Sequence, residues 1–67
     1  MNFSELLATY VGRRIEVYES DRFVEGVLLR VGTGFFVIQV SGTDYPGTAD
    51  ELTIFNQSVE YVRLLAA

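Results

Sequence analysis

The stretch "GVLLRVGTGFFVI", from Gly26 to Ile38, decides the fold of this chain. Its two apolar runs are rich in the β-branched and aromatic residues that favour strands. The segment between them, Gly32-Thr33-Gly34, fits a three-residue hairpin loop with its last glycine in the left-handed conformation. The pattern therefore predicts two antiparallel strands, over residues 23–31 and 35–41.

This hairpin has apolar pairs on both faces near its turn. The predicted register places Leu28 opposite Ile38 on one face and Leu29 opposite Val37 on the other. A sheet with one solvated face would alternate apolar and polar residues instead. We expect either that the strands curl into a barrel under a helix, or that the second face meets another chain. Gly26 marks where a bent strand would fold over, although a glycine that only relieves crowding would give the same pattern.

Upstream of the hairpin, residues 2–11 are predicted to form the one helix. Its apolar residues fall at helical spacing and form a single stripe, which comprises Phe3, Leu6, Leu7, Tyr10 and Val11. Asn2 can cap the first turn with Glu5 as its capping-box partner, and Gly12 suits the left-handed residue after the last turn. The apolar period then changes to two, which predicts a strand over residues 13–19.

The end of the chain, "LTIFNQSVEYVRLL", reads as strands over residues 51–55 and 59–65, hinged at Asn56-Gln57-Ser58. The hinge is short and suits one tight helical turn. In the last strand we expect Val59, Tyr61 and Leu65 on one face and Val62 and Leu64 on the other, so neither face is polar. An apolar edge strand invites pairing with another chain. Residues 42–50, with the only proline, are predicted to form a loop.

Length and composition limit the possibilities further. The 67 residues predict a single domain over 1–67, and the chain contains neither Cys nor His, so we expect no disulfide, no metal site and no cofactor. A domain of this size buries only about 60% of its unfolded surface. The hydrophobic fraction of 49% exceeds what one small core can hide, which favours a subunit interface. No apolar run is long enough to span a membrane and no leader pattern is visible, so we expect no membrane partner and a cytoplasmic location.

The charged residues also exclude some classes of function. Nine acidic residues outnumber five basic ones, for a net charge of −4, and this balance opposes binding to nucleic acid. The commonest catalytic bases and nucleophiles, His, Cys and Lys, are missing. We therefore expect no enzymatic activity and no small-molecule substrate.

The order of one helix and five short strands, with a glycine-bent second strand, resembles the Sm-like family, including its Hfq branch. The residues that carry the resemblance are "GVLLRVGTGFFVI" and "IFNQSVEYV", from Ile54 to Val62, and it spans nearly the whole chain. It implies a mainly β fold, with an N-terminal α-helix followed by a five-stranded, strongly bent antiparallel SH3-like/Sm-like barrel. A second, weaker resemblance is to short Sm-like proteins of spore-forming bacteria, some associated with the spore coat.

In Sm-like proteins, strand four of one subunit pairs with strand five of the next and a ring results. The resemblance thus implies that residues 51–55 and 59–65 are the two halves of a ring seam, and that the partner is a second copy of this chain. The implied interface residues are Leu52, Thr53, Ile54, Phe55, Tyr61, Val62, Arg63 and Leu64. Main-chain hydrogen bonds would satisfy both edges while surplus apolar side chains pack between subunits.

The resemblance also implies that single-stranded RNA binds at the ring face. The candidate residues are Phe36, Phe55, Asn56 and Gln57. The chain departs from the family here, because Gly32 and Phe36 replace the usual Asp and Asn, and Phe55-Asn56-Gln57 replaces the Arg-Gly motif of Sm proteins or the aromatic-Lys-His run of Hfq. Phe55 could stack on a base, or it could pack in the seam while its neighbours only complete a turn. The alternative is an adaptor or coat-type assembly ring that binds no nucleic acid.

Overall fold

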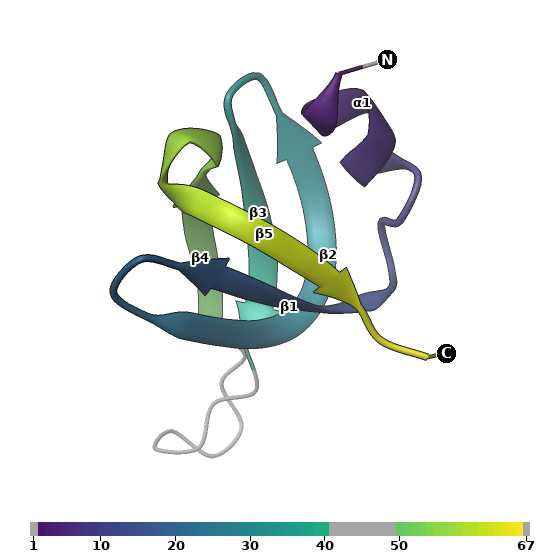
Figure 1. Ribbon diagram of the computed structural model, residues 1–67. Helices are drawn as coiled ribbons and strands as arrows, with labels where there is room; N and C mark the ends of the chain where they lie inside the picture. Colours follow the sequence, from purple (N-terminus) through teal and green to yellow (C-terminus); the bar gives the residue numbers. More distant parts are fainter. Residues whose placement is uncertain (1, 41–49, 67) are drawn as a thin grey trace.

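The structure is a computed structural model that describes residues 2–40 and 50–66 (Figure 1). The elements follow in the order α1 (Phe3–Ala8), β1 (Arg14–Glu19), β2 (Phe23–Gly32), β3 (Phe35–Val40), β4 (Asp50–Phe55), the 3-10 helix η1 (Asn56–Ser58) and β5 (Val59–Leu64). The prediction of a mainly β fold with one short N-terminal helix and five antiparallel strands is confirmed. The predicted loop over 42–50 lies outside the described residues except for Asp50, the first residue of β4. None of the helices in the described part has the length and apolarity to cross a membrane.

The five strands form one antiparallel sheet in the order β4-β3-β2-β1-β5. Figure 1 shows the sheet strongly bent, with β1 and β5 running across the direction of β3 and β4. The sheet is not closed, because β4 and β5 are not paired with each other and form its two edges. The two strands predicted for the end of the chain are therefore both edge strands, joined by the single turn of η1.

The helix is shorter than predicted, and it ends at Ala8 instead of Val11. Its start is as expected, because the Asn2 side chain accepts a 2.8 Å hydrogen bond from the backbone N–H of Glu5. After Ala8 the chain turns toward β2, where the N–H of Gly12 donates to the carbonyl of Leu28 over 2.8 Å. Gly12 has a φ of +95°, the left-handed conformation that the sequence predicted. Residues 9–11 continue the helix only as tight turns, with each backbone N–H bonded to the carbonyl three residues before it, and pairing with β2 begins at Gly12.

The β2–β3 hairpin is tighter than predicted and contains an irregularity. Gly34 has the expected left-handed backbone, with φ +80°, and Leu28 lies opposite Ile38. The predicted pair of Leu29 with Val37 is wrong, because a register shift between Leu28 and Arg30 pairs Val37 with Arg30 instead. Such a bulge adds one residue to one strand, bends that strand and increases its twist.

At Gly26, β2 lies very close to the backbone of β3. A Cβ atom at this position would overlap the carbonyl oxygen of Gln39 on β3, so no larger residue fits without a shift of the backbone. Gly26 also pairs with Ile15 of β1 and therefore lies between two strands. The glycine allows a close backbone approach between β2 and β3, which follows from both interpretations of the sequence, a bent strand and relief of crowding.

The core lies on the inner face of the bent sheet, beneath α1. Its fully or almost fully buried members are Leu7, Ile15, Val17, Leu28, Phe36, Ile38 and Ile54. Of the predicted helical stripe, only Leu7 is buried, while Phe3, Leu6 and Val11 are each at least 41% exposed. The helix therefore buries one side chain in the core and leaves Leu6 and much of Phe3 at the surface, although the Phe3 ring lies 6.3 Å from that of Phe36.

The predicted faces of β5 need a correction. Val59 and Val62 both pack against the core cluster, whereas Tyr61 is exposed. Tyr18 pairs with Tyr61 but the next residue, Glu19, pairs with Val59, so Glu60 is an extra residue in a β-bulge. The bulge reverses the alternation of side chains and brings two valines three positions apart to the same face.

Candidate functional site

The two free edges of the sheet are the first candidate for a functional surface. On β4, Ile54 is buried in the core and Leu52 packs against it, whereas Thr53 and Phe55 are exposed. Phe55 is 56% exposed, although it is a large apolar side chain. An exposed ring at the end of an unpaired edge strand is available to a partner.

The β5 edge has the same character. Val62 packs against the core, but Tyr61 is 55% exposed and Leu64 is 37% exposed. Arg63 lies between them, and its Nη1 atom is 3.6 Å from Oε1 of Glu16 on β1. Every residue predicted for the ring seam therefore lies on one of the two sheet edges, and both edges combine core-facing aliphatic residues with an exposed aromatic ring.

An aromatic row crosses the outer face of β2, β1 and β5. The ring of Tyr18 stacks on Tyr61, with centroids 4.3 Å apart and planes 16° apart, and lies 4.9 Å from the ring of Phe23. The Tyr18 hydroxyl donates a 3.1 Å hydrogen bond to Glu16, and partial burial together with this carboxylate raises the pKa of Tyr18 above its ordinary value. A second aromatic pair, Phe35 with Phe55, lies across β3 and β4.

An apolar groove lies between α1 and β5. Its lining residues are Phe3, Leu6, Leu7, Tyr10, Tyr61, Val62 and Leu64. The groove contains the exposed Phe3 and Leu6 of the helical stripe and borders the free edge of β5. A strand that paired with β5 would therefore lie beside an apolar surface.

The four residues predicted to bind RNA do not form one accessible patch. Phe36 is fully buried, with its ring 6.3 Å from that of Phe3, so it belongs to the core. Asn56 is partly buried, and its Nδ2 atom donates to Oγ of Ser4 over 2.9 Å. Phe55 and Gln57 are exposed and flank Asn56. The structure thus leaves two of the four side chains at the surface, Phe55 at the end of β4 and Gln57 in the middle of η1.

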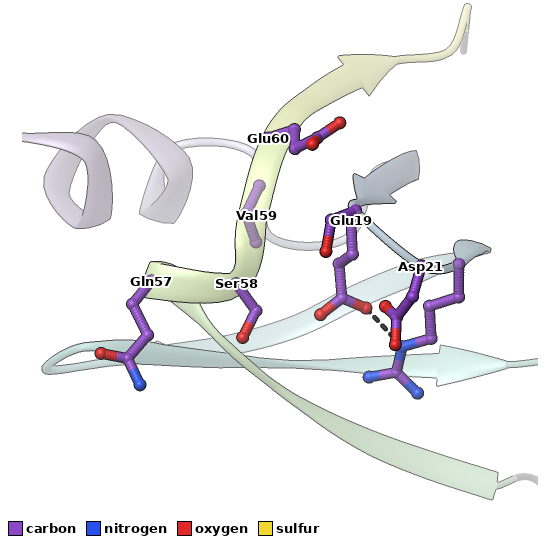
Figure 2. A pocket seen from close by; sticks show the side chains of 8 residues that line it. Glu19, Asp21, Gln57, Ser58, Val59 and Glu60 are labelled. Atoms are coloured by element: carbon purple, nitrogen blue, oxygen red, sulfur yellow. Dashed lines mark hydrogen bonds and ion pairs between the residues drawn. The ribbon is translucent and has the colours of Figure 1, made fainter.

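A polar pocket lies between η1 and the β1–β2 turn. Figure 2 shows Glu19 at the end of β1 and Asp21 of the turn on one side of it, and Gln57 and Ser58 on the other. Glu19 is largely buried and forms an ion pair with Arg22. The described residues contain no group of three acidic side chains arranged as a metal site. The pocket therefore presents hydrogen-bonding groups and excess negative charge to solvent.

All five arginines have a partner within the chain. Four form ion pairs, which are Arg14 with Glu25 (3.4 Å), Arg22 with Glu19, Arg30 with Glu51 (2.8 Å) and Arg63 with Glu16 (3.6 Å). Arg13 donates from Nη2 to the carbonyl oxygen of Leu65 over 2.9 Å. Four acidic residues, Glu5, Asp21, Asp50 and Glu60, have no arginine partner in residues 2–40 and 50–66. The described surface accordingly has no concentration of unbalanced positive charge to hold phosphates.

Comparisons with protein-family models, with curated proteins and with solved structures find no match. The Sm-like resemblance therefore remains a prediction from the residues. Sequence reasoning did not identify the aromatic row, because Phe23, Tyr18 and Tyr61 lie on three strands. Only the strand register brings them together, including the bulge at Glu60 that turns Tyr61 outward.

Proposed function

We propose that this protein is a non-catalytic, Sm-like β-barrel subunit whose function is to assemble with copies of itself into a closed ring. The observation that carries the proposal is the sheet order, in which β4 and β5 are both edges. The two edges expose Phe55 and Tyr61, respectively. Exposed apolar edge strands are templates for pairing with another chain.

The two edges of one subunit differ, so pairing β4 of one copy with β5 of the next is a heterologous contact. Such contacts generate rings when the rotation between neighbours closes, and filaments when it does not. The strong bend of the sheet turns the two edges in different directions, which supports a rotation between successive subunits (Figure 1). We therefore favour a ring that serves as a scaffold, adaptor or coat-type component.

Edge-breaking variants test this proposal. Phe55→Asp alters only the β4 edge and Tyr61→Asp only the β5 edge, so each variant alone is expected to be a folded monomer. In an equimolar mixture, the intact β4 edge of one variant meets the intact β5 edge of the other. One seam per pair can then form, and native mass spectrometry should detect dimers of one chain of each kind.

The control is Phe23→Asp, because Phe23 is half-exposed but lies on β2, which is not an edge. This variant should keep the oligomeric state of the natural chain. Dimers formed by either edge variant alone would instead indicate a symmetric contact and contradict the heterologous seam. A natural chain that is monomeric would contradict the proposal altogether.

Binding of single-stranded RNA is the second candidate function. It is favoured by one observation, the exposure of Phe55 and Gln57 on either side of Asn56, where a ring would repeat them around an axis. Aromatic side chains of this kind stack on unpaired bases. The pairing of every arginine weighs against it, since phosphate contacts supply most of the affinity for nucleic acid.

Fluorescence anisotropy with a labelled single-stranded RNA tests this second function. If RNA binds around η1, Phe55→Ala and Gln57→Ala should weaken binding, while Thr33→Ala in the exposed β2–β3 turn should leave it unchanged. No detectable binding at low salt would exclude the RNA function and leave the assembly function as the remaining proposal.

A further inference from the structure

We infer that neighbouring copies pair in the register that places Phe55 of β4 opposite Tyr61 of β5, so that one aromatic row runs across the seam. This inference rests on the proposed assembly of β4 with β5, and it specifies which residues meet. The occupant of the β5 edge is thus the β4 strand of a second copy of this chain.

The first step is the alternation of side chains between the two faces of a sheet. A sheet that continues across the seam must keep its core-facing residues on one side. On β4, the core-facing residues are Leu52 and Ile54. On β5, Val62 and Leu64 lie opposite the buried Val17 and Ile15 of β1, so both are on the core-facing side of the sheet, although Leu64 is 37% exposed at its edge. Registers that place Ile54 opposite Tyr61 or Arg63 are therefore excluded.

The second step is the bulge at Glu60. Beyond the bulge, residues 61–64 are the regular part of β5. Two registers of the correct parity pair all four of these residues with β4. One places Tyr61 opposite Thr53 and Arg63 opposite Glu51, and the other places Tyr61 opposite Phe55 and Arg63 opposite Thr53.

The third step compares these two registers. The first would gain an ion pair between Arg63 and Glu51, but each already has a partner in its own chain, Glu16 and Arg30, respectively. The same register would place the carboxylate of Asp50 opposite Leu64, which borders the apolar groove. It would also leave the exposed ring of Phe55 beyond the regular part of β5.

The second register instead brings the exposed apolar residues of the two edges together. It pairs Phe55 with Tyr61, Ile54 with Val62 and Leu52 with Leu64. Tyr61 already stacks on Tyr18, which contacts Phe23, and Phe55 is paired with Phe35. The seam would thereby join the two aromatic groups of neighbouring copies into one row of five rings, Phe35 and Phe55 followed by Tyr61, Tyr18 and Phe23.

Disulfide crosslinking reads this register directly, because the natural chain has no cysteine. The variant T53C/R63C introduces two cysteines that face each other across the seam only in the inferred register. The matched variant E51C/R63C does so only in the other register. Directly opposite residues have Cβ atoms about 4.5–5.5 Å apart, near the separation of a disulfide, whereas diagonal neighbours are about 7–8 Å apart. Both variants keep Phe55 and Tyr61.

Under mild oxidation, T53C/R63C should form a ladder of covalent oligomers on a non-reducing gel, and E51C/R63C should remain largely uncrosslinked. A ladder from E51C/R63C alone would overturn the inferred register while leaving the seam between β4 and β5 in place. If neither variant crosslinks, native mass spectrometry separates the remaining cases. An intact oligomer would overturn the register alone, and a monomer would overturn the proposed assembly itself.

Discussion

Asn56 donates a hydrogen bond from its Nδ2 atom to Oγ of Ser4, 2.9 Å away, and so ties η1 to the first turn of α1. Its backbone N–H donates to the carbonyl of Gly34 over 3.0 Å, which adds a tie to the β2–β3 hairpin. The turn that joins the two sheet edges is therefore fixed to the rest of the domain. A ring needs this property, because its closure depends on a constant angle between the β4 and β5 edges.

The tie between Asn56 and Ser4 predicts a coupled loss of stability. Asn56→Ala should lower the free energy of unfolding by about 0.5–1.5 kcal/mol, the usual net contribution of one hydrogen bond. Ser4→Ala should cost a similar amount, and the double variant little more than either single one. Urea unfolding measures these values, with the exposed Gln57→Ala as a control within about 0.5 kcal/mol of the natural chain. Fully additive losses would contradict the coupling.

The close approach of Gly26 to Gln39 predicts that a larger residue at this position lowers the stability of the fold. A methyl group at Gly26 overlaps a backbone carbonyl, which cannot rotate away as a side chain can. Gly26→Ala should therefore lower the free energy of unfolding by about 1–3 kcal/mol, the range for overpacked interiors. Thr33→Ala in the exposed turn is the control. Equal thermal midpoints for Gly26→Ala and the natural chain would show that β2 and β3 are not in close contact at this point.

The environment of Tyr18 predicts a dependence on alkaline pH. Partial burial and the neighbouring Glu16 raise the pKa of Tyr18 in the folded state, so folding favours the neutral phenol. The resulting stability is complete below about pH 10, where the unfolded tyrosine titrates, and is lost as the pH rises through the higher folded pKa. Tyr18→Phe should make the thermal midpoint fall less steeply above pH 10. Identical pH profiles for the two chains would contradict this role of the Tyr18 hydroxyl.

The apolar character of the proposed seam predicts how the proposed assembly responds to salt. In 1 M NaCl the screening length falls to about 3 Å, so a seam held by exposed ion pairs would weaken. A seam of aromatic and aliphatic residues should persist, and sedimentation velocity in 0.1 M and 1 M NaCl compares the two conditions. Dissociation at high salt would favour the register that pairs Arg63 with Glu51.

Much of the fold follows from local patterns in the sequence. The change of apolar period from helical to strand spacing located the elements, and Gly12 and Gly34 have the left-handed backbone that their positions indicated. Gly26 was identified as a position of close backbone approach because it is a glycine within an apolar strand, and a Cβ atom there would overlap the Gln39 carbonyl. These features depend on one residue and its immediate neighbours.

The errors arise where pairing between distant segments decides the outcome. The bulges after Leu28 and at Glu60 follow from how neighbouring strands fit together, and each reverses the faces that simple alternation predicts. The hydrogen bond of Asn56 with Ser4 spans 52 positions, so the hinge alone gives no sign of it. Phe36 was chosen as a candidate from a family position, whereas its pairing opposite Ile54 and Val31 places it in the core.

The most direct test of the central claim, a ring closed by β4–β5 pairing, is native mass spectrometry of the natural chain from a buffer of moderate salt. We predict a single assembly whose mass is one fixed multiple of 7.5 kDa, unchanged as the protein is diluted over the micromolar range. Any additional mass removed by ribonuclease would support the RNA function as well. A monomer of 7.5 kDa at every concentration would contradict the claim, since both edges of the sheet would then remain unpaired in solution.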